Sequence, residues 1–371
     1  MIRIDEIYGN TFWPFIKNQV SNTKLYCCDP PGNTNPDSLI HFGGNSIDMI
    51  NYIFFHDQEP IHLDIYADLF AEVYDRNPLD NISYVDAQRR HGIVTSESNS
   101  ESVEELCKKY NWEFYYYFFH GWAALDWYRG YDKTFLISPA SKRKITKTFI
   151  APNRIIAGER KHRLEMLYHI FKNRMLDNHI SCPDTCPVEN ISIHEAIKPL
   201  AERYPDIESV FSRTPLPIQF AGETDHPMHS CWLSLFDEAA ESLLYLVTET
   251  VYTGRRHHLT EKTFKPIALR MPFVIVGTKG SLKYLRSYGF RTFEGIWDES
   301  YDDSEDEDRI KHIANLLRNL NELPLSGKQD LFNMAQEVIE HNWNHFYNGG
   351  FEAVLWAELQ GMLAKIKKDF Y

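Results

Sequence analysis

Short apolar runs alternate with amphipathic stretches along the second half of the chain. Two of these runs, Ser242–Thr248 and Phe273–Val276, have the continuous apolar pattern of strands buried on both faces. Residues 260–269 and 281–288 carry apolar side chains at helical spacing, and 290–293 has the composition of one more short strand. From residue 309 to the end the pattern is almost wholly helical. Strands that alternate with helices predict a parallel sheet for this half of the chain.

The first half shows the same alternation, with shorter runs that are rich in aromatic residues. In this half we predict strands over 38–42, 49–55, 92–96 and 114–119, and helices over 65–74 and 103–110. The stretch that joins the two halves predicts a strand over 148–151 and helices from residue 158, over 187–204 and over 231–240.

A length of 371 residues is typical of two domains. We therefore predict an α/β fold with two Rossmann-like domains and a helical C-terminal tail. The boundary between the domains is expected near residue 145. Residues 1–145 would form the first α/β domain, 146–345 the second, and 346–371 a C-terminal helix.

The formal net charge of −13 disfavours non-specific binding to nucleic acid or to an anionic membrane, because both carry negative phosphates. Much of the acidic excess lies in 298–308, DESYDDSEDED, which we expect to be a solvated loop. Aromatic residues make up 14% of the chain. Flat rings can cover the apolar faces of sugars and bases, although most of these rings are expected to fill the core.

The six cysteines do not have the density of a disulfide-stabilised domain. Cys182 and Cys186 form a C-x3-C pair, but no second Cys/His pair has a matching spacing, so we predict no metal site. The N-terminal sequence MIRIDEIYGNTFWPF lacks the basic and apolar regions of a signal peptide. No run of about 18 apolar residues occurs either. We expect a cytoplasmic protein without a membrane span.

Two common nucleotide-binding motifs are missing from the sequence. No G-x-G-x-x-G follows a predicted strand, which argues against an NAD-linked enzyme. No G-x-x-x-x-G-K-[ST] occurs, which argues against the P-loop nucleoside triphosphatases.

The densest group of polar side chains follows the predicted strand that ends at Thr248. Glu249 comes directly after it, Thr260 is placed to cap the next helix, and Glu261 and Lys262 fall in the first helical turn. A helix start directs amide hydrogens and the positive end of its dipole outward, which suits a diphosphate. Glu261 is suited to accept hydrogen bonds from ribose hydroxyls. The alternative is an ordinary capped helix start with solvated charges.

Further basic residues surround this helix start. Arg255 precedes it, and Lys265 lies one turn inside it, so both would add positive charge next to a diphosphate. His258 lies in the same loop, and we expect Glu249 and Thr260 to contribute to the same nucleotide-binding site.

The order of motifs in this region resembles a known family. The segments T-E-K-x-F-K-P and P-F-V-I-V-G resemble the donor-binding motif of the alpha-1,3-fucosyltransferases, glycosyltransferase family 10. Related bacterial and phage glycosyltransferase-like sequences share D-Q-E-P, here 57–60, and G-F-x-T-F followed by D-E-S-Y-D, here 289–293 and 298–302. The resemblance is dense from about 245 to 310 and sparse elsewhere.

This resemblance implies a GT-B glycosyltransferase that takes a sugar from a nucleoside-diphosphate sugar, its donor substrate, with no cofactor and no metal. It implies that Glu261 and Lys262 bind the ribose and phosphates of the donor. His258 stands where the family has a tyrosine, a departure that bears on the identity of the base and the sugar. It also implies a basic residue against the diphosphate at the start of the second domain, for which Arg160 and Arg163 are the candidates. The alternative is that Arg160 and Arg163 are ordinary charged residues on the solvent-exposed face of a helix.

Transfer with inversion needs a base that takes the proton of the acceptor hydroxyl. In a GT-B enzyme this base comes from the first domain, where Asp57 and Glu59 follow a predicted strand. Their alternative role is to cap the next helix or to form a local ion pair. A second polar group, which we expect to line the acceptor site at the end of another strand, consists of His120, Trp122, Asp126 and Trp127.

Three functions remain open at this point. The first is transfer of a hexose or pentose to a saccharide or glycan. The second is transfer to a hydroxymethylated base in DNA, with 142–147 and 154–163 lining a basic groove. The third is non-catalytic binding of a nucleotide sugar or a glycan.

Overall fold

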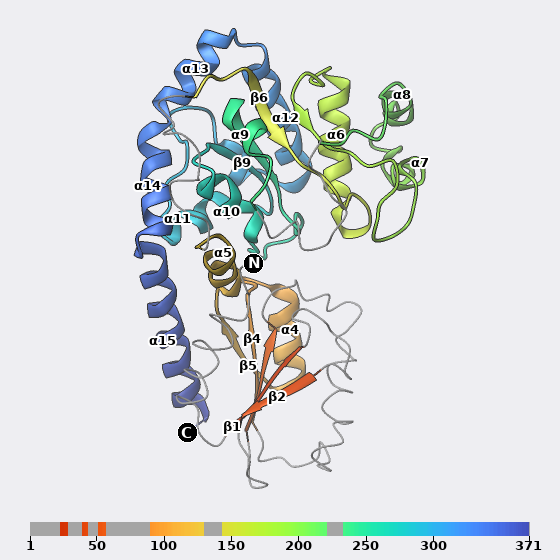
Figure 1. The fold of residues 1–371 in the computed structure, drawn as a ribbon. Coiled ribbons are helices and arrows are strands. Elements are labelled where there is room, and N and C mark those ends of the chain that lie inside the picture. Colours follow the sequence, from red (N-terminus) through yellow and green to blue (C-terminus); the bar gives the residue numbers. More distant parts are fainter. Residues whose placement is uncertain are drawn as a thin grey trace. The chain divides into compact units, whose positions relative to one another are not determined.

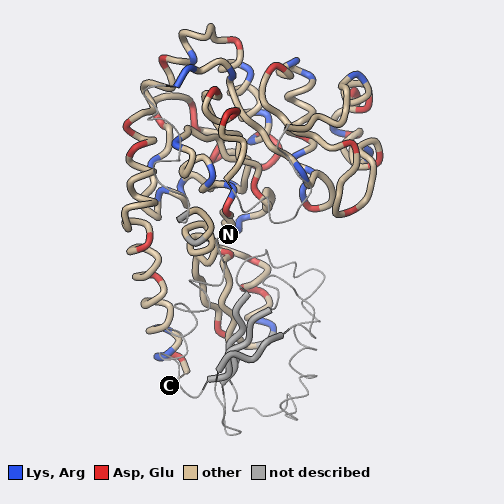
Figure 2. Tube along the Cα trace, in the orientation of Figure 1, with Lys and Arg blue, Asp and Glu red and all other residues tan. Residues whose placement is uncertain are grey.

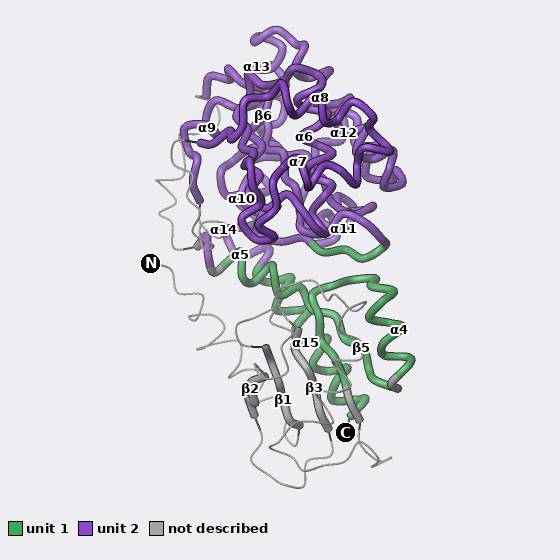
Figure 3. The backbone as a smooth tube through the Cα atoms, turned by 90° about the vertical axis from the view of Figure 1, so that its right-hand side faces the viewer, with its two compact units in different colours: residues 1–126, 255–258, 352–371 green, residues 127–254, 259–351 purple. Residues whose placement is uncertain are grey.

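The computed structural model describes residues 23–28, 39–43, 51–56, 90–129, 143–220 and 233–370 (Figure 1). The chain divides into two compact units (Figure 3). Unit 1 comprises residues 1–126, 255–258 and 352–371, and unit 2 comprises 127–254 and 259–351. The helix predicted over 65–74 and the two carboxylates Asp57 and Glu59 lie outside the described residues.

Unit 1 contains a sheet with the strand order β2-β1-β3-β4-β5. Its strands are β1 (Thr23–Cys28), β2 (Leu39–Gly43), β3 (Asn51–His56), β4 (Arg90–Thr95) and β5 (Glu113–Tyr116). β2 is antiparallel to β1, and the other neighbours are parallel. α4 (Glu101–Tyr110) connects β4 to β5, as predicted.

The strand predicted over 114–119 is shorter than expected, because α5 (Phe119–Arg129) begins at its last residue. His120, Trp122 and Trp127 therefore lie within a helix and not at the end of a strand. The long C-terminal helix α15 (Gly350–Phe370) confirms the predicted helical tail and packs along β5. Phe118 donates its amide hydrogen to Glu358 Oε2 at 3.0 Å.

Unit 2 contains a fully parallel sheet with the order β7-β6-β8-β9. Its strands are β6 (Lys147–Ala151), β7 (His179–Ile180), β8 (Ser242–Thr248) and β9 (Phe273–Val276). β8 is buried along its whole length, which confirms its apolar pattern. In the sheet, β6 lies between β7 and β8. The chain passes from β6 to β7 on one side and later forms β8 on the other side of β6. The topological switch point of the sheet therefore lies between β6 and β8.

Helices cover this sheet on both faces. α6 (Lys161–Lys172) connects β6 to β7, and α10 (Glu261–Ala268) connects β8 to β9. These right-handed crossovers run in opposite directions, so the two helices lie on opposite faces of the sheet. α6 packs against α12 (Asp306–Asn321) and α10 against α14 (Gln336–Tyr347). The remaining helices are α7 (Ile193–Ala196), α8 (Ile207–Ser212), α9 (Phe236–Glu241), α11 (Ser281–Ser287) and α13 (Leu325–Met334).

Three predicted elements of unit 2 are wrong in extent or type. Residues 187–204 do not form one helix, because Pro199 follows the short α7 and lacks the amide hydrogen that would continue it. Residues 290–293 are not a strand, since the amides of Arg291 and Phe293 bond to the side chains of Asn342 and Glu299. Of the helix predicted over 231–240, only the part from Phe236 is helical among the described residues.

The acidic run 298–308 is more ordered than predicted. Ser300–Asp303 form a 3₁₀ turn, and α12 begins at Asp306. Within the run, Asp302 is buried. In the parts of the chain that the structure describes, no helix combines the length and the apolar character needed to cross a membrane.

Candidate functional site

Two loops leave the sheet of unit 2 at its switch point. One loop follows β6 and the other follows β8. Asn153, just after β6, accepts a hydrogen bond from the Thr248 hydroxyl at the end of β8, at 3.0 Å. The main-chain amide of Asn153 donates to the hydroxyl of Ser181 at 2.8 Å, and Ser181 directly follows β7. Because ligands of parallel sheets bind outside the carboxyl ends of the strands at such a point, these loops are the candidate site of unit 2.

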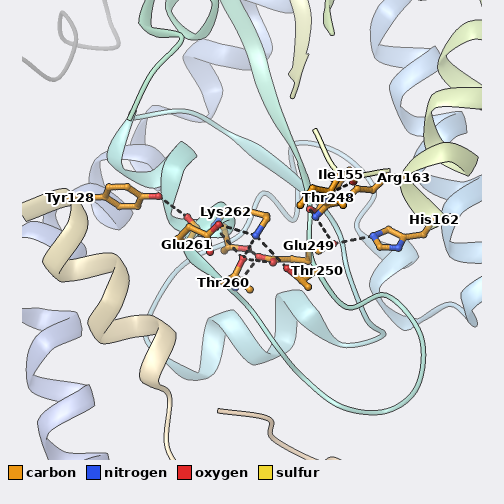
Figure 4. Close-up of polar contacts among 11 residues, drawn as sticks. Tyr128, Ile155, His162, Arg163, Thr248, Glu249, Thr250, Thr260, Glu261 and Lys262 are labelled. Carbon is orange, nitrogen blue, oxygen red and sulfur yellow. Dashed lines mark hydrogen bonds and ion pairs between the residues drawn. The ribbon is translucent and has the colours of Figure 1, made fainter. Parts of the chain in front are cut away.

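Glu249 ties the start of α10 to the end of β8 (Figure 4). Its buried carboxylate accepts hydrogen bonds from the Thr260 amide at 3.1 Å, the Thr260 hydroxyl at 2.7 Å and the Thr263 hydroxyl at 2.6 Å. Three donors at one carboxylate offset much of its lost hydration. Glu249 was predicted to bind the donor substrate, but in the structure its carboxylate is occupied within the chain and positions the helix.

Arg163 connects the two loops through hydrogen bonds to their main chains. Its guanidinium is buried and donates to the carbonyls of Ile155 at 2.8 Å, Thr248 at 3.0 Å and Glu249 at 3.2 Å. Burial, together with the nearby charge of Arg160, lowers the pKa of Arg163 to about 10, so it remains charged near neutral pH. The guanidinium of Arg163 therefore binds three main-chain carbonyls and not, as predicted, a diphosphate.

His162 supports the same loop on the side of Tyr252. The two rings are stacked, with their centroids 5.0 Å apart, and His162 Nε2 lies 3.0 Å from the Glu249 carbonyl oxygen. Burial lowers the pKa of His162 to about 3, and the charge of Arg163 acts in the same direction. The imidazole is therefore neutral at ordinary pH, with Nε2 as the hydrogen donor.

Lys262 directs its ammonium group along the capped start of α10 (Figure 4). The Nζ atom lies 2.8 Å from Glu261 Oε1, 3.2 Å from Thr260 Oγ1 and 3.3 Å from Thr250 Oγ1. An ammonium has three hydrogens, so these three acceptors use all of them. The two hydroxyl contacts are long for hydrogen bonds, so a phosphate oxygen could replace one at small cost and form a charge-assisted bond.

The first amides of α10 are mostly bonded inside the chain. The Thr260 amide goes to Glu249, and the Thr263 amide to the Thr260 carbonyl at 3.2 Å. The Lys262 amide meets the Thr260 hydroxyl at 3.4 Å, which is a weak cap. The helix start was expected to direct several free amide hydrogens towards a diphosphate. Because most of these amides have partners within the chain, this expectation is met only in part. The Lys262 ammonium and the helix dipole supply most of the positive potential here.

The neighbouring helix start is closed by a carboxylate. Asp302 accepts hydrogen bonds from the amides of Leu282, at 2.9 Å, and Lys283, at 3.1 Å, at the start of α11. A carboxylate in that position already neutralises the helix end and repels a phosphate. The D-E-S-Y-D segment therefore has a structural role, and α10 is the helix start of this sheet better suited to an anion.

Arg160 adds a second cation beside the switch point. It lies on the 3₁₀ turn Gly158–Arg160 after β6 and is half-buried. Its guanidinium makes no hydrogen bond or ion pair with any residue in the described ranges. Its positive charge lowers the pKa of both His162 and Arg163, whereas the charge of Glu261 raises that of Arg163. Arg160 and Glu261 are therefore both near Arg163.

Glu261 and Lys265 complete the predicted residues of α10. Glu261 is buried, and its carbonyl accepts a hydrogen bond from the Tyr128 hydroxyl at 3.2 Å. Lys265 is half-buried, one turn further along the helix.

The other predicted site residues lie in unit 1 or in the core. His258 belongs to unit 1, where its ring lies edge-on to that of His120 at 4.8 Å. Trp122 is buried and packs edge-on against Trp356, and Trp127 is buried in unit 2. The rings predicted to line the acceptor site are therefore core residues. The side chain of Asp126 lies outside the described part of the chain.

Several residues of the predicted basic groove are not available as free surface charges. Arg143 is buried and donates to the Leu269 carbonyl at 2.7 Å, and Lys147 pairs with Asp177 at 2.7 Å. Arg163 is buried as well. Basic and acidic residues are interspersed along the described trace (Figure 2).

Cys182 and Cys186 are both buried thiols. Cys186 Sγ lies 2.6 Å from Glu189 Oε2 and accepts the Ile156 amide hydrogen at 3.5 Å. Within the described ranges, no three or more His, Cys, Asp or Glu side chains gather where they could hold a metal ion.

No protein-family model and no curated protein matches the sequence. Among solved structures, the chain is similar to the T4 phage BGT in complex with UDP-glucose, with a TM-score of 0.34 and 13% identity over 80% of this chain and 73% of that one. It is also similar to an alpha,alpha-trehalose-phosphate synthase (UDP-forming) from Burkholderia vietnamiensis, with a TM-score of 0.39 and 12% identity over 88% of this chain and 74% of that one. Likenesses this weak establish neither a family nor an activity.

Proposed function

We propose that the chain is a metal-independent GT-B glycosyltransferase that transfers a sugar from a nucleoside-diphosphate sugar to an acceptor hydroxyl. The observation that carries this proposal is the Lys262 ammonium, held by Thr260 and Glu261 at the start of a helix beside the β6/β8 switch point. Lys262 and Arg160 would bind the diphosphate, and Glu261 would accept hydrogen bonds from the ribose.

The reaction needs positive charge where the bond between the sugar and the diphosphate breaks. The leaving nucleoside diphosphate gains negative charge as that bond lengthens. A fixed ammonium, a guanidinium and a helix start stabilise this charge more in the transition state than in the ground state. With inversion, Glu59 or Asp57 of the first domain would take the proton from the acceptor oxygen as it attacks the anomeric carbon.

We propose a saccharide or glycan as the acceptor, with a hexose or pentose as the transferred sugar. Transfer to a hydroxymethylated DNA base is the weaker candidate, because Arg143 and Arg163 are buried and Lys147 is paired. If the protein lowers the electrophoretic mobility of a DNA duplex and added salt abolishes this effect, that candidate would be favoured. The T-E-K motif favours a donor of the kind used by the fucosyltransferases.

A thermal-shift screen tests the proposal. The protein is heated with GDP, UDP and their sugar conjugates, each at a concentration far above its dissociation constant. A ligand at 100 times its Kd adds about 2.7 kcal/mol to the stability of the folded state. We expect one nucleoside diphosphate to raise the Tm clearly. If none of them changes the Tm, the transferase proposal is wrong.

A further inference from the structure

The hydroxyl of Thr250, in the loop that leaves β8, acts only as an acceptor within the described chain. Its Oγ1 atom accepts a hydrogen bond from the Lys262 ammonium at 3.3 Å (Figure 4). Among the described residues, no group accepts the hydrogen of this hydroxyl. Thr250 is only 8% exposed. Because buried polar groups nearly always have partners, this hydrogen points to an acceptor that a ligand supplies.

The main chain just before Thr250 is fixed by two residues of α6. Arg163 donates to the carbonyls of Thr248 at 3.0 Å and Glu249 at 3.2 Å. His162 Nε2 lies 3.0 Å from the same Glu249 carbonyl oxygen. The residue that carries the Thr250 amide is therefore held in place within unit 2.

The main chain just after Thr250 is fixed by the side chain of Tyr252. Its ring is stacked on His162, with the centroids 5.0 Å apart, and the Arg309 guanidinium lies 4.6 Å from its centroid. Arg309 also donates to the Tyr252 carbonyl at 2.8 Å, and the Tyr252 hydroxyl donates to the Asp306 carbonyl. Thr250 thus lies between two anchored positions. A group that is held before a ligand arrives loses little freedom on binding.

The rest of this loop belongs to the other unit. Residues 255–258 are part of unit 1 (Figure 3). Arg255 was predicted to add charge next to the diphosphate, but it forms an exposed ion pair with Glu101 at 3.1 Å. Thr250 and Lys262, by contrast, both belong to unit 2.

The geometry of Thr250 and Lys262 suits one shared anionic oxygen. Because Oγ1 and Nζ are 3.3 Å apart, an oxygen at about 2.8 Å from each can accept a hydrogen from both. The Thr260 hydroxyl also lies near Lys262, but it already gives its hydrogen to Glu249 at 2.7 Å. Of these two hydroxyls, only that of Thr250 has a hydrogen left to donate.

We infer that Thr250 is a further donor-binding residue, whose hydroxyl donates to the same diphosphate oxygen that the Lys262 ammonium binds. The inference rests on the proposed function, because it takes this oxygen from the donor diphosphate. Two donors on one oxygen fix its position as well as its charge. Thr250 thereby orients the diphosphate, whereas Lys262 supplies the electrostatic attraction.

The test compares Thr250→Val with Thr250→Ser, which keeps the hydroxyl. Thr253→Val is the matched control, because it removes an exposed hydroxyl of the same loop. The Kd of GDP or UDP, whichever raises the Tm of the wild type, is measured by calorimetry. We expect Thr250→Val to raise this Kd about tenfold, and the other two variants to leave it within about twofold.

A double variant tests whether the two groups share one oxygen. In a Lys262→Ala background, Thr250→Val should raise the Kd by clearly less than it does alone, because the diphosphate is no longer held at that point. Independent effects of the two substitutions would overturn the shared oxygen. The Tm of each variant without nucleotide shows whether it is folded as the wild type is.

The outcomes separate this inference from the function on which it rests. If the wild type binds neither GDP nor UDP, the proposed function fails, and the inference fails with it. If the wild type binds one of them and Thr250→Val binds it equally well, Thr250 is not a donor-binding residue, although the proposed function stands. A loss in Thr250→Ser as large as in Thr250→Val would also overturn the role of the hydroxyl. Should Thr250→Val not fold, Thr250→Ala removes the same hydroxyl and is judged by the same results.

Discussion

The hydroxyl of Thr260 connects the buried carboxylate of Glu249 to the ammonium of Lys262. Its oxygen lies 2.7 Å from Glu249 Oε2 and 3.2 Å from Lys262 Nζ. A hydroxyl has one hydrogen to donate and two lone pairs. Because the hydrogen goes to Glu249, the lone pairs face the amide and the ammonium of Lys262. The orientation of Lys262 is thus set by a group at the end of β8.

Removing this hydroxyl should weaken both the helix and the site. We expect Thr260→Val to lower the free energy of unfolding by about 1–3 kcal/mol, because a cap is lost and Glu249 loses a donor. Urea unfolding measures this effect, and calorimetry should show weaker binding of the nucleoside diphosphate. Thr260→Ser keeps the hydroxyl and should retain most of both properties. Equal losses in the two variants would argue against the hydroxyl as the cause.

The ammonium of Lys262 should matter for binding more than for folding. A hydrogen bond to a charged group contributes about 1.5–3 kcal/mol, so Lys262→Ala should raise the Kd of the diphosphate by about tenfold to a hundredfold. Lys283→Ala, on the exposed surface of α11, removes an equal charge and serves as the control. A similar Kd for both variants would mean that the effect of Lys262 is long-range charge alone.

The neutral state of His162 predicts a loss of stability in acid. Its pKa is about 3 in the folded protein, against an ordinary value of 6.5, so the unfolded chain binds one more proton between these values. The free energy of unfolding should therefore fall as the pH drops from 6.5 towards 3, with this residue contributing at most about 1.4 kcal/mol per pH unit.

Comparing wild type with His162→Gln isolates this contribution. The glutamine amide can still donate to the Glu249 carbonyl but does not titrate. Urea unfolding at several pH values should give the variant a shallower slope, by about one proton. His169, whose pKa burial lowers to about 4, still titrates in both proteins. An unchanged slope would show that His162 does not carry the effect.

The candidate general bases can be separated from the donor site by kinetics. We expect Glu59→Ala to bind the nucleoside diphosphate as the wild type does but to lose turnover, because only proton transfer from the acceptor is removed. Asp57→Ala is tested in parallel. A fully active Glu59→Ala variant would rule Glu59 out as the base, and activity in both variants would place the base elsewhere.

The local elements of unit 2 could be predicted from sequence, because their signals are short-range. The run Ser242–Thr248 is apolar throughout, and Thr260 precedes a helical stretch, so both β8 and the cap of α10 followed directly. The elements that failed are those whose backbone partners are distant side chains. The amides over 290–293, for example, bond to Glu299 and Asn342.

The roles of the charged residues were harder to predict, because burial depends on tertiary packing. Arg163 was expected to meet a diphosphate, but it donates to carbonyls of two loops. A signal was present: Arg163, Leu167 and Ile170 share one face of α6, so this arginine interrupts an apolar stripe.

A crystal structure with the nucleoside diphosphate that raises the Tm would show whether the start of α10 binds the donor. We expect a phosphate oxygen within hydrogen-bonding distance of Lys262 Nζ and a ribose hydroxyl on the Glu261 carboxylate. A nucleotide bound elsewhere, with the start of α10 free of phosphate, would show that this helix start is not the donor site.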